Sequence, residues 1–377
     1  MLGVTLKATY TGTRKANGDE LQVRMKNVVG PWRAGKFMPL TMRPHSLNCY
    51  GFSKLWHRCT AMDLRIGDVS AINKYAKAWL YADLLEKPEE LALYRQTKLG
   101  GLGLYHVQLR ALAHLINSFL ETACSPKFRR NLFHQTLFNF YVLEDNTSQP
   151  PDIPPYFKGD FFPAIKRIHA SPLNVANISL KNIYRFLLEE ITMTEDESGS
   201  QTLTPLRIEL ANPANQWDRS WEMARQNMLG PTLTTFLFKL FHQILPTAER
   251  VSRILPNQSH FCSRCKSSPP IVETLQHAMF DCDDSKASEV LLLGLKEVIP
   301  DLTQTKILTL NFDPPEDYSF PVVWSIAHFL SSLWQLRAEK KQVQLIKIRS
   351  DMEASCRLLR ESRLHKTNDI LTKIFRT

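Results

Sequence analysis

The sequence predicts a mainly α-helical protein, and three observations support this fold class. Apolar residues recur at helical spacing through most of the chain. Glycine and proline are concentrated between those segments, where they are typical of turns and breaks. Alternation of apolar and polar residues, which would indicate strands, is rare. We therefore expect helical regions that surround a small metal-binding module and end in long C-terminal helices.

The N-terminal third contains turns between helical segments. Residues 21–29 and 46–56 have helical spacing, and residues 63–124 are mostly helical in pattern. Gly100-Gly101-Leu102-Gly103 interrupts that stretch, because consecutive glycines are unfavourable inside a helix. The segment lacks the GxGxxG spacing and the flanking strand of a nucleotide-binding loop, so we interpret it as a turn between two helices.

Breaks after residue 145 suggest how the chain is divided. Residues 146–155 are rich in proline and residues 195–200 are acidic, which is typical of linkers. Residues 217–254 read as two helices broken near Gly230, and one or two long helices are expected over 322–375, with Trp324, Leu330, Trp334 and Leu336 facing inward. The predicted regions are 1–145 (helical), 146–200 (linker-rich), 201–300 (helical with a metal module) and 301–377 (basic and helical).

Four residues of metal-ligating type lie in one short segment. Cys262, Cys265, His277 and Cys282 have the spacing Cys-x2-Cys-x11-His-x4-Cys. Thiolates and an imidazole are the ligands that a tetrahedral zinc ion takes. The first pair can face a metal from a tight turn, and the second pair can face it from the end of a short helix. The pattern therefore predicts a Zn²⁺ site.

The predicted zinc is structural, because four protein ligands leave no open position for a catalytic water. A disulfide is the alternative, but a Cys-x2-Cys pair bridges poorly, and the residues after Met1 do not resemble a secretory signal. The remaining cysteines are scattered and are interpreted as reduced thiols: Cys49, Cys59, Cys124 and Cys356. These features favour the nucleus and/or the cytoplasm.

The net charge of +10 is concentrated at the two ends of the sequence. Residues 1–60 hold ten lysines and arginines against two acids, and residues 336–377 hold eleven against five. Such ends fit contact with the phosphates of RNA or DNA, and the alternative, which charge alone does not distinguish, is the solvated surface of a mildly basic protein. No run of about 18 uncharged apolar residues occurs, so no membrane-spanning segment is expected.

Several tryptophans adjoin basic residues, as in Trp32-Arg33, Lys54-Leu55-Trp56 and Trp334 with Arg337. Such pairs can stack on bases and hold phosphates. The alternative is that each tryptophan anchors a helix in the core. The density of basic residues predicts nucleic-acid contacts at Arg33, Lys36, Arg43, Lys54, Arg58, Arg337, Lys340 and Lys341.

Several segments together resemble the part of a LINE-type (non-LTR) retrotransposon reverse transcriptase that follows the polymerase palm. Residues 2–4 look like the palm exit, and residues 98–104 look like the family's GGLGL turn. The thumb helix pattern is similar to Trp32, Leu40, Arg43, Asn48 and residues 53–56. The approach to the family's terminal zinc region is similar to residues 239–242, Pro246, Thr247, Arg250 and Glu273-Thr274.

The resemblance implies that residues 1–145 are thumb-like and that the family's zinc ligands correspond to Cys262, Cys265, His277 and Cys282. The family's catalytic aspartates have no counterpart, because Tyr81-Ala82-Asp83 is followed by Leu84 and a single carboxylate does not make a two-metal site. We therefore expect a fragment that is not an enzyme on its own and that binds RNA and/or DNA. The alternative is a domesticated protein-interaction module with an unknown protein partner and no nucleic-acid binding.

Overall fold

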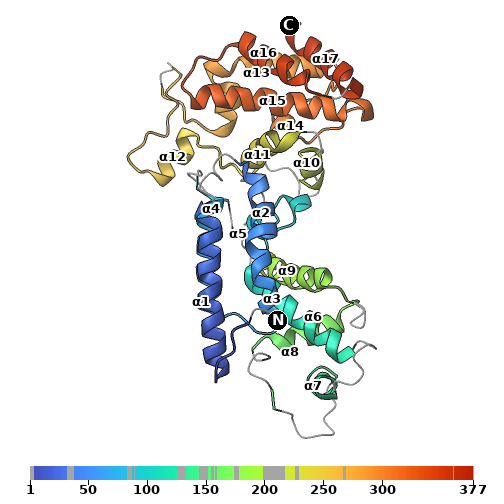
Figure 1. Ribbon diagram of the computed structural model, residues 1–377. Coiled ribbons are helices and arrows are strands. Elements are labelled where there is room, and N and C mark those ends of the chain that lie inside the picture. Colours follow the sequence, from blue (N-terminus) through green and yellow to red (C-terminus); the bar gives the residue numbers. More distant parts are fainter. Residues whose placement is uncertain are drawn as a thin grey trace. The chain divides into compact units, whose positions relative to one another are not determined.

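The computed structural model describes residues 4–31, 38–82, 87–88, 90–124, 132–143, 152–153, 157, 159–173, 178–197, 217–225, 229–265, 269–359 and 361–376. Within these ranges the chain is helical, and its only β pairing is one antiparallel bridge between Phe261 and Val272. The mainly α fold is therefore confirmed (Figure 1). The chain forms two compact units, one of Met1–Asp83 with Gly103–Thr202 and one of Leu84–Leu102 with Leu203–Thr377.

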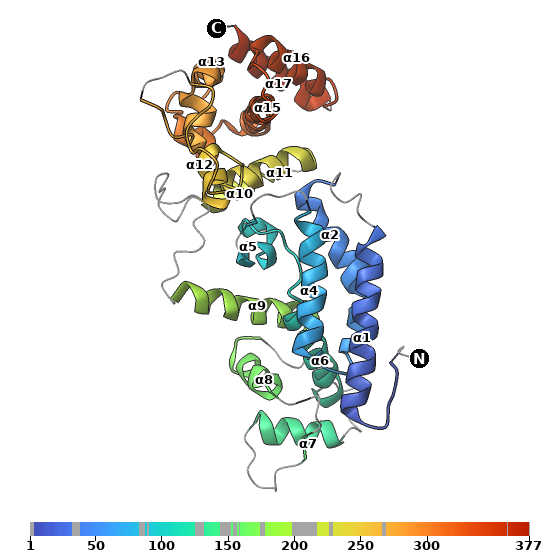
Figure 2. The same cartoon turned by 90° about the vertical axis from the view of Figure 1, so that its left-hand side faces the viewer.

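The first unit contains two groups of helices. The helices are α1 (Tyr10–Val29), α2 (Arg43–Ser46), α3 (Ser53–Cys59), α4 (Ile66–Leu80), α6 (Val107–Cys124), α7 (Leu132–Tyr141), α8 (Phe161–Ala170) and α9 (Leu180–Glu197). Helix α1 packs along α4, and α6 packs on α3, α7 and α9 (Figure 2). Both helical segments expected before residue 60 are present, and α1 is longer than expected because Thr9 caps it by accepting a hydrogen bond from the Gly12 amide.

The segment predicted to be linker-rich, residues 146–200, contributes core to the first unit. Most of its proline-rich part lies outside the described residues, but α8 and α9 lie within it. Ile165 and Ile168 of α8 and Leu187 of α9 are buried. Phe119 of α6 meets Phe161 edge to face, with 5.3 Å between ring centroids. Apolar spacing in these helices thus outweighs the proline and acidic composition that suggested a linker.

The second unit is built around α15 (Ser319–Ala338). Its other helices are α5 (Glu90–Tyr94), α10 (Trp217–Met223), α11 (Gly230–Phe241), α12 (Ala248–Ile254), α13 (Ala287–Lys296), α14 (Gln304–Thr309), α16 (Leu345–Cys356) and α17 (Glu361–Phe375). Helix α15 is mostly apolar and is buried along most of its length, with α11, α13, α16 and α17 packed around it. The region expected to form one or two long helices thus forms three. Trp324, Leu330 and Leu336 point inward as predicted, whereas Trp334 is half-buried.

The glycine segment before α6 is a turn, as predicted. Gly100 has a left-handed φ of +85°, which favours glycine, and a Cβ atom there would lie 2.4 Å from the Trp221 ring. The half-buried His242 ring is hydrogen-bonded to the Gly100 carbonyl through Nε2 at 2.9 Å. Residues 84–102 consequently pack with the second unit, and the chain enters the first unit at Gly103.

Candidate metal centre and basic residues

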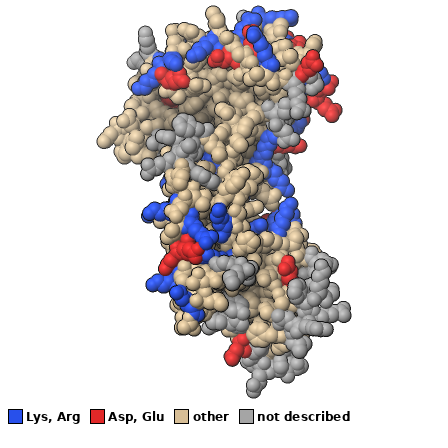
Figure 3. All heavy atoms as spheres, viewed as in Figure 1, with Lys and Arg blue, Asp and Glu red and all other residues tan. Residues whose placement is uncertain are grey.

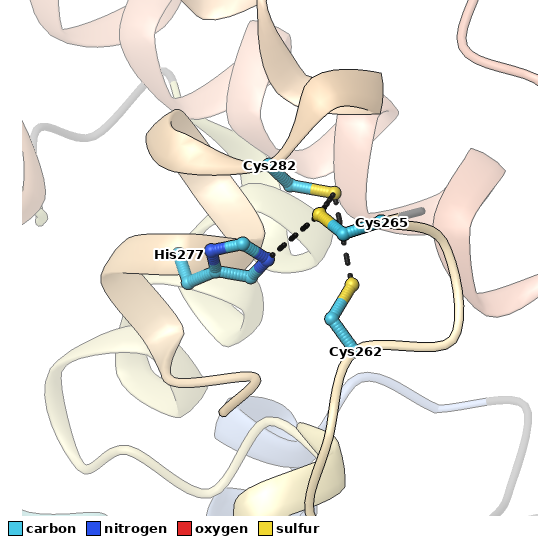
Figure 4. Close-up of side chains that lie close together, drawn as sticks. All are labelled: Cys262, Cys265, His277 and Cys282. Carbon is cyan, nitrogen blue, oxygen red and sulfur yellow. Dashed lines mark hydrogen bonds between the residues drawn. The ribbon is translucent and has the colours of Figure 1, made fainter. Parts of the chain in front are cut away.

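The structure brings together the four residues that the sequence spacing singled out. One ligand atom from each of Cys262, Cys265, His277 and Cys282 lies within 4.8 Å of the others. Cys282 Sγ is 3.7 Å from Cys262 Sγ and 3.6 Å from Cys265 Sγ, and His277 Nε2 is 3.3 Å from Cys265 Sγ (Figure 4). Cys262, His277 and Cys282 are buried, and Cys265 is half-buried. These residues form a Cys/His cluster that could hold a metal ion.

The first two ligands are presented by the antiparallel bridge. The Cys262 amide donates to the Ile271 carbonyl at 2.8 Å, and the Glu273 amide donates to the His260 carbonyl at 3.0 Å. This pairing fixes the backbone at Cys262 and on both sides of Phe261. Residues 263–264 form a bend, so the Cys-x2-Cys pair lies on a bend that directly follows a hydrogen-bonded backbone segment.

The last two ligands come from one turn of π-helix, His277–Asp281, with Cys282 as the residue that ends it. The Cys282 amide donates to the His277 carbonyl at 2.8 Å, five residues back. Ser285 and Ser288 then tie the turn to the following helix, because their hydroxyls donate to the carbonyls of Ala278 and Met279, each at 2.5 Å. The short helix predicted for this pair is thus present in its wider, π form.

Arg337 lies against this cluster and not on the surface. Its side chain is buried, and its Nη2 atom is 3.9 Å from Cys262 Sγ and 3.5 Å from Glu273 Oε2. Its Nη1 atom is 3.4 Å from Ser285 Oγ. The prediction of a nucleic-acid contact at Arg337 is therefore wrong for this structure, since the guanidinium faces thiols and a carboxylate inside the protein.

The guanidinium influences the ionisation of the cluster. Burial opposes the charged form of Cys282, but the hydrogen bond from Arg337, the backbone hydrogen bond at Asp284, the positive charge of Arg337 and the hydrogen bond with Cys265 together lower the pKa of that thiol. Burial raises the pKa of Cys265, and the neighbouring thiols add to the rise. Negative charge in the cluster is therefore favoured beside Arg337.

A second arginine ties the Cys-x2-Cys turn to the end of α15. Arg264 lies between the two cysteines and pairs with Asp284. It also donates to the carbonyls of Arg337 at 2.9 Å and Lys341 at 3.1 Å. The Arg337 carbonyl lies in the last turn of α15 and the Lys341 carbonyl lies just beyond that helix, so Arg264 joins the Cys-x2-Cys segment to this end of α15. The sequence pattern did not single out Arg264, although a basic side chain between two metal ligands is a position that could have been weighed.

Two further predicted phosphate contacts are also inside the protein. Arg43 is buried and donates to the carbonyls of Met38 at 2.9 Å and Leu80 at 2.8 Å. Arg58 is buried and pairs with Glu20 at 2.8 Å. Both guanidinium groups therefore serve the packing of the first unit, and the predicted phosphate contacts at these two positions are wrong. Trp56 is likewise buried and stacks on His114, with 5.5 Å between ring centroids.

The other predicted nucleic-acid contacts are either exposed or outside the described residues. Lys54, Lys340 and Lys341 are exposed, and Lys341 pairs with Glu339 at 2.6 Å. Arg33 and Lys36 lie outside the described residues. On the face drawn in Figure 3, lysines and arginines are interspersed with acidic residues over the C-terminal helices. The described residues of those helices therefore present a mixed charge pattern on this face.

Among the described residues, no helix is long and apolar enough to span a membrane. No protein-family model matches the chain, and no curated protein matches it.

Proposed function

We propose that this chain is a non-catalytic, nucleic-acid-binding fragment of the kind found after the palm of LINE-type reverse transcriptases, and that Cys262, Cys265, His277 and Cys282 hold a structural zinc. The observation that carries the proposal is the spacing of the ligand atoms. Two sulfurs that each lie about 2.3 Å from a tetrahedral zinc are about 3.8 Å apart. The separations of 3.6 and 3.7 Å are close to that value.

The donor set supports zinc over a hard cation, because thiolate and imidazole ligands suit zinc, whereas magnesium and calcium take oxygen. The three sulfurs are also much farther apart than the roughly 2.05 Å of a disulfide. Four protein ligands in a mostly buried cluster favour a closed site that stabilises the fold. A zinc held in this way contributes to folding and leaves no position for a substrate.

Metal analysis by mass spectrometry tests the zinc. The purified protein is expected to contain one zinc per chain, and Cys265→Ser is expected to lose it. Cys49→Ser is the matched control, because Cys49 is exposed and belongs to the first unit. A wild-type protein that binds no zinc under reducing conditions would refute the site.

Nucleic-acid binding is supported by the net charge and by the exposed lysines Lys54, Lys340 and Lys341. Each phosphate contact releases counterions, so affinity should fall steeply with salt. Filter binding over a salt series is expected to show that Lys340→Ala with Lys341→Ala reduces the slope of log affinity against log salt by about 1 to 2. Lys181→Ala, which removes an exposed charge from α9, should leave the slope unchanged. An affinity that does not depend on salt contradicts the proposal.

A second candidate function is protein interaction, favoured by exposed apolar side chains on the bridged segments next to the cluster and at the end of α12. Phe261 and Ile271 lie on the bridged segments and are 38% and 42% exposed, and Ile254 and Leu255 at the end of α12 are 39% and 45% exposed. Absence of RNA and DNA binding together with a stable protein partner would favour this function.

A further inference from the structure

We infer that Arg337 is a positioning residue of the metal centre, whose guanidinium balances the charge of the thiolates and holds their sulfurs in place. This inference rests on the zinc site proposed above. It also gives α15, the buried central helix of the second unit, a direct part in metal binding.

The charge of the site calls for such a residue. A zinc ion with three thiolates and a neutral imidazole carries one net negative charge. Cys282 and Cys262 are buried, so water does not screen that charge. The Arg337 guanidinium lies 3.9 Å from Cys262 Sγ. A cation at this place stabilises the loaded site and lowers the cost of assembling the sulfurs.

The guanidinium is itself fixed from several directions. Glu273 and Ser285 lie within 3.5 Å of it, and the Ser285 hydroxyl is anchored on the Ala278 carbonyl in the turn that presents His277. Glu273 belongs to the bridge that presents Cys262. One side chain from α15 therefore contacts both halves of the cluster, and residues that orient metal ligands in this way affect affinity.

Arg264 provides a matched comparison. It reaches the same end of α15, but its contacts are with Asp284 and with backbone carbonyls. Removal of Arg264 should weaken the attachment of the turn to the helix. Removal of Arg337 should, in addition, change the environment of the sulfurs.

The test uses the full chain loaded with zinc or with Co²⁺, whose charge-transfer absorption from thiolate reports the sulfur environment. Arg337→Gln is expected to lower zinc affinity by about 10- to 100-fold in chelator competition and to shift the cobalt–thiolate band. Arg337→Lys, which keeps the charge, should recover at least half of the loss on a logarithmic scale. Arg264→Gln should lower the melting temperature and change zinc affinity and the cobalt band less than Arg337→Gln does. Arg349→Gln, which removes an exposed arginine of α16 that pairs with Glu353, should change neither zinc affinity nor the cobalt band.

The outcomes separate this inference from the zinc proposal. A wild-type chain without zinc refutes the metal site itself. A wild-type chain with zinc, together with Arg337→Gln of unchanged affinity and spectrum, overturns only the role of Arg337, as does Arg337→Lys that binds no better than Arg337→Gln. If Arg337→Gln does not fold, Glu273→Gln takes its place, because Glu273 holds the guanidinium against the cluster. A shifted cobalt–thiolate band in Glu273→Gln then supports the role of Arg337, and a wild-type band with wild-type zinc affinity overturns it.

Discussion

Replacement of Gly294 by alanine probes the packing that surrounds the metal centre. Gly294 lies in α13, where this helix meets α17 at close range. A Cβ atom at this position would lie 2.4 Å from Ile374 Cα and 2.7 Å from the Lys373 carbonyl oxygen. Both atoms belong to backbone, so no side chain can rotate away to make room.

The magnitude follows from two opposing terms. The helices would need to separate by about 1 Å to restore ordinary contact, and overpacking of a core costs about 1–3 kcal/mol. Alanine gains at most about 1 kcal/mol over glycine in helix propensity. Since Ile374 is fully buried and cannot yield to solvent, the upper part of the cost applies. The expected net loss is about 1–2 kcal/mol, or a decrease of about 2–8 °C in the melting temperature of the second unit.

Urea denaturation of the zinc-loaded protein, followed by circular dichroism and by tryptophan fluorescence, measures this loss. Gly67→Ala is the control, because Gly67 lies in α4 and a Cβ atom there would have no neighbour within 4 Å. That variant should be as stable as the wild type or gain up to about 1 kcal/mol. A Gly294→Ala protein as stable as the wild type would refute the close approach of α13 and α17.

Three other predictions concern pH, backbone strain and metal. Burial lowers the pKa of His114 in the folded protein to about 4, so the imidazole binds a proton more tightly in the unfolded chain. The stability of the first unit should therefore fall as pH decreases from about 6.5 to 4. The free energy of unfolding should change by at most about 1.4 kcal/mol per pH unit over this range, and by less than this because the ring is partly exposed. His114→Phe, which can still stack on Trp56, should reduce this slope in urea titrations at several pH values, and an unchanged slope would exclude His114 as its source. Lys340 has a left-handed φ of 56°, a conformation that favours glycine and disfavours β-branched residues. Lys340→Gly should therefore raise the free energy of unfolding of the second unit by about 0.5 kcal/mol, and Lys340→Val should lower it. A Lys340→Val protein more stable than Lys340→Gly would contradict backbone strain at this position. A chelator should lower the melting transition of the second unit and leave that of the first unit unchanged, and calorimetry with and without excess zinc distinguishes this result from a uniform effect.

The sequence predicted the ligand set because metal chemistry restricts residue type and spacing together. Cys262, Cys265, His277 and Cys282 are local in sequence, so their proximity depends on one turn and one short helix. The helical segments were predictable for a similar reason, since periodicity is a local property. The places of Arg43, Arg58 and Arg337 were not predictable in this way, because each is set by contacts far along the chain. For Arg337 the partner Cys262 is 75 residues away.

The proline-rich and acidic composition of parts of residues 146–200 led to the incorrect prediction of a linker, again because burial depends on contacts between distant residues. Prolines at 150–155 and acids at 195–197 mark the edges of residues 146–200, whereas the apolar faces of α8 and α9 between them determine burial. Packing between residues distant in sequence therefore determines that this segment is part of the core, which its local composition did not indicate. The same holds for residues 84–102, which join the second unit through the contacts of Gly100 with Trp221 and His242.

The π turn at His277–Asp281 explains why four residues separate His277 from Cys282. In an α-helix, positions five residues apart point about 140° away from each other. A π turn adds one residue and brings positions five apart to the same side of the chain. The four-residue interval between His277 and Cys282 is therefore matched to this turn. A variant with one residue deleted between them could restore the ligand geometry by reverting to an α turn, whereas an inserted residue would have no regular helix to accommodate it. The site should thus tolerate shortening better than lengthening, an asymmetry that sets which natural or engineered length changes this segment can accept.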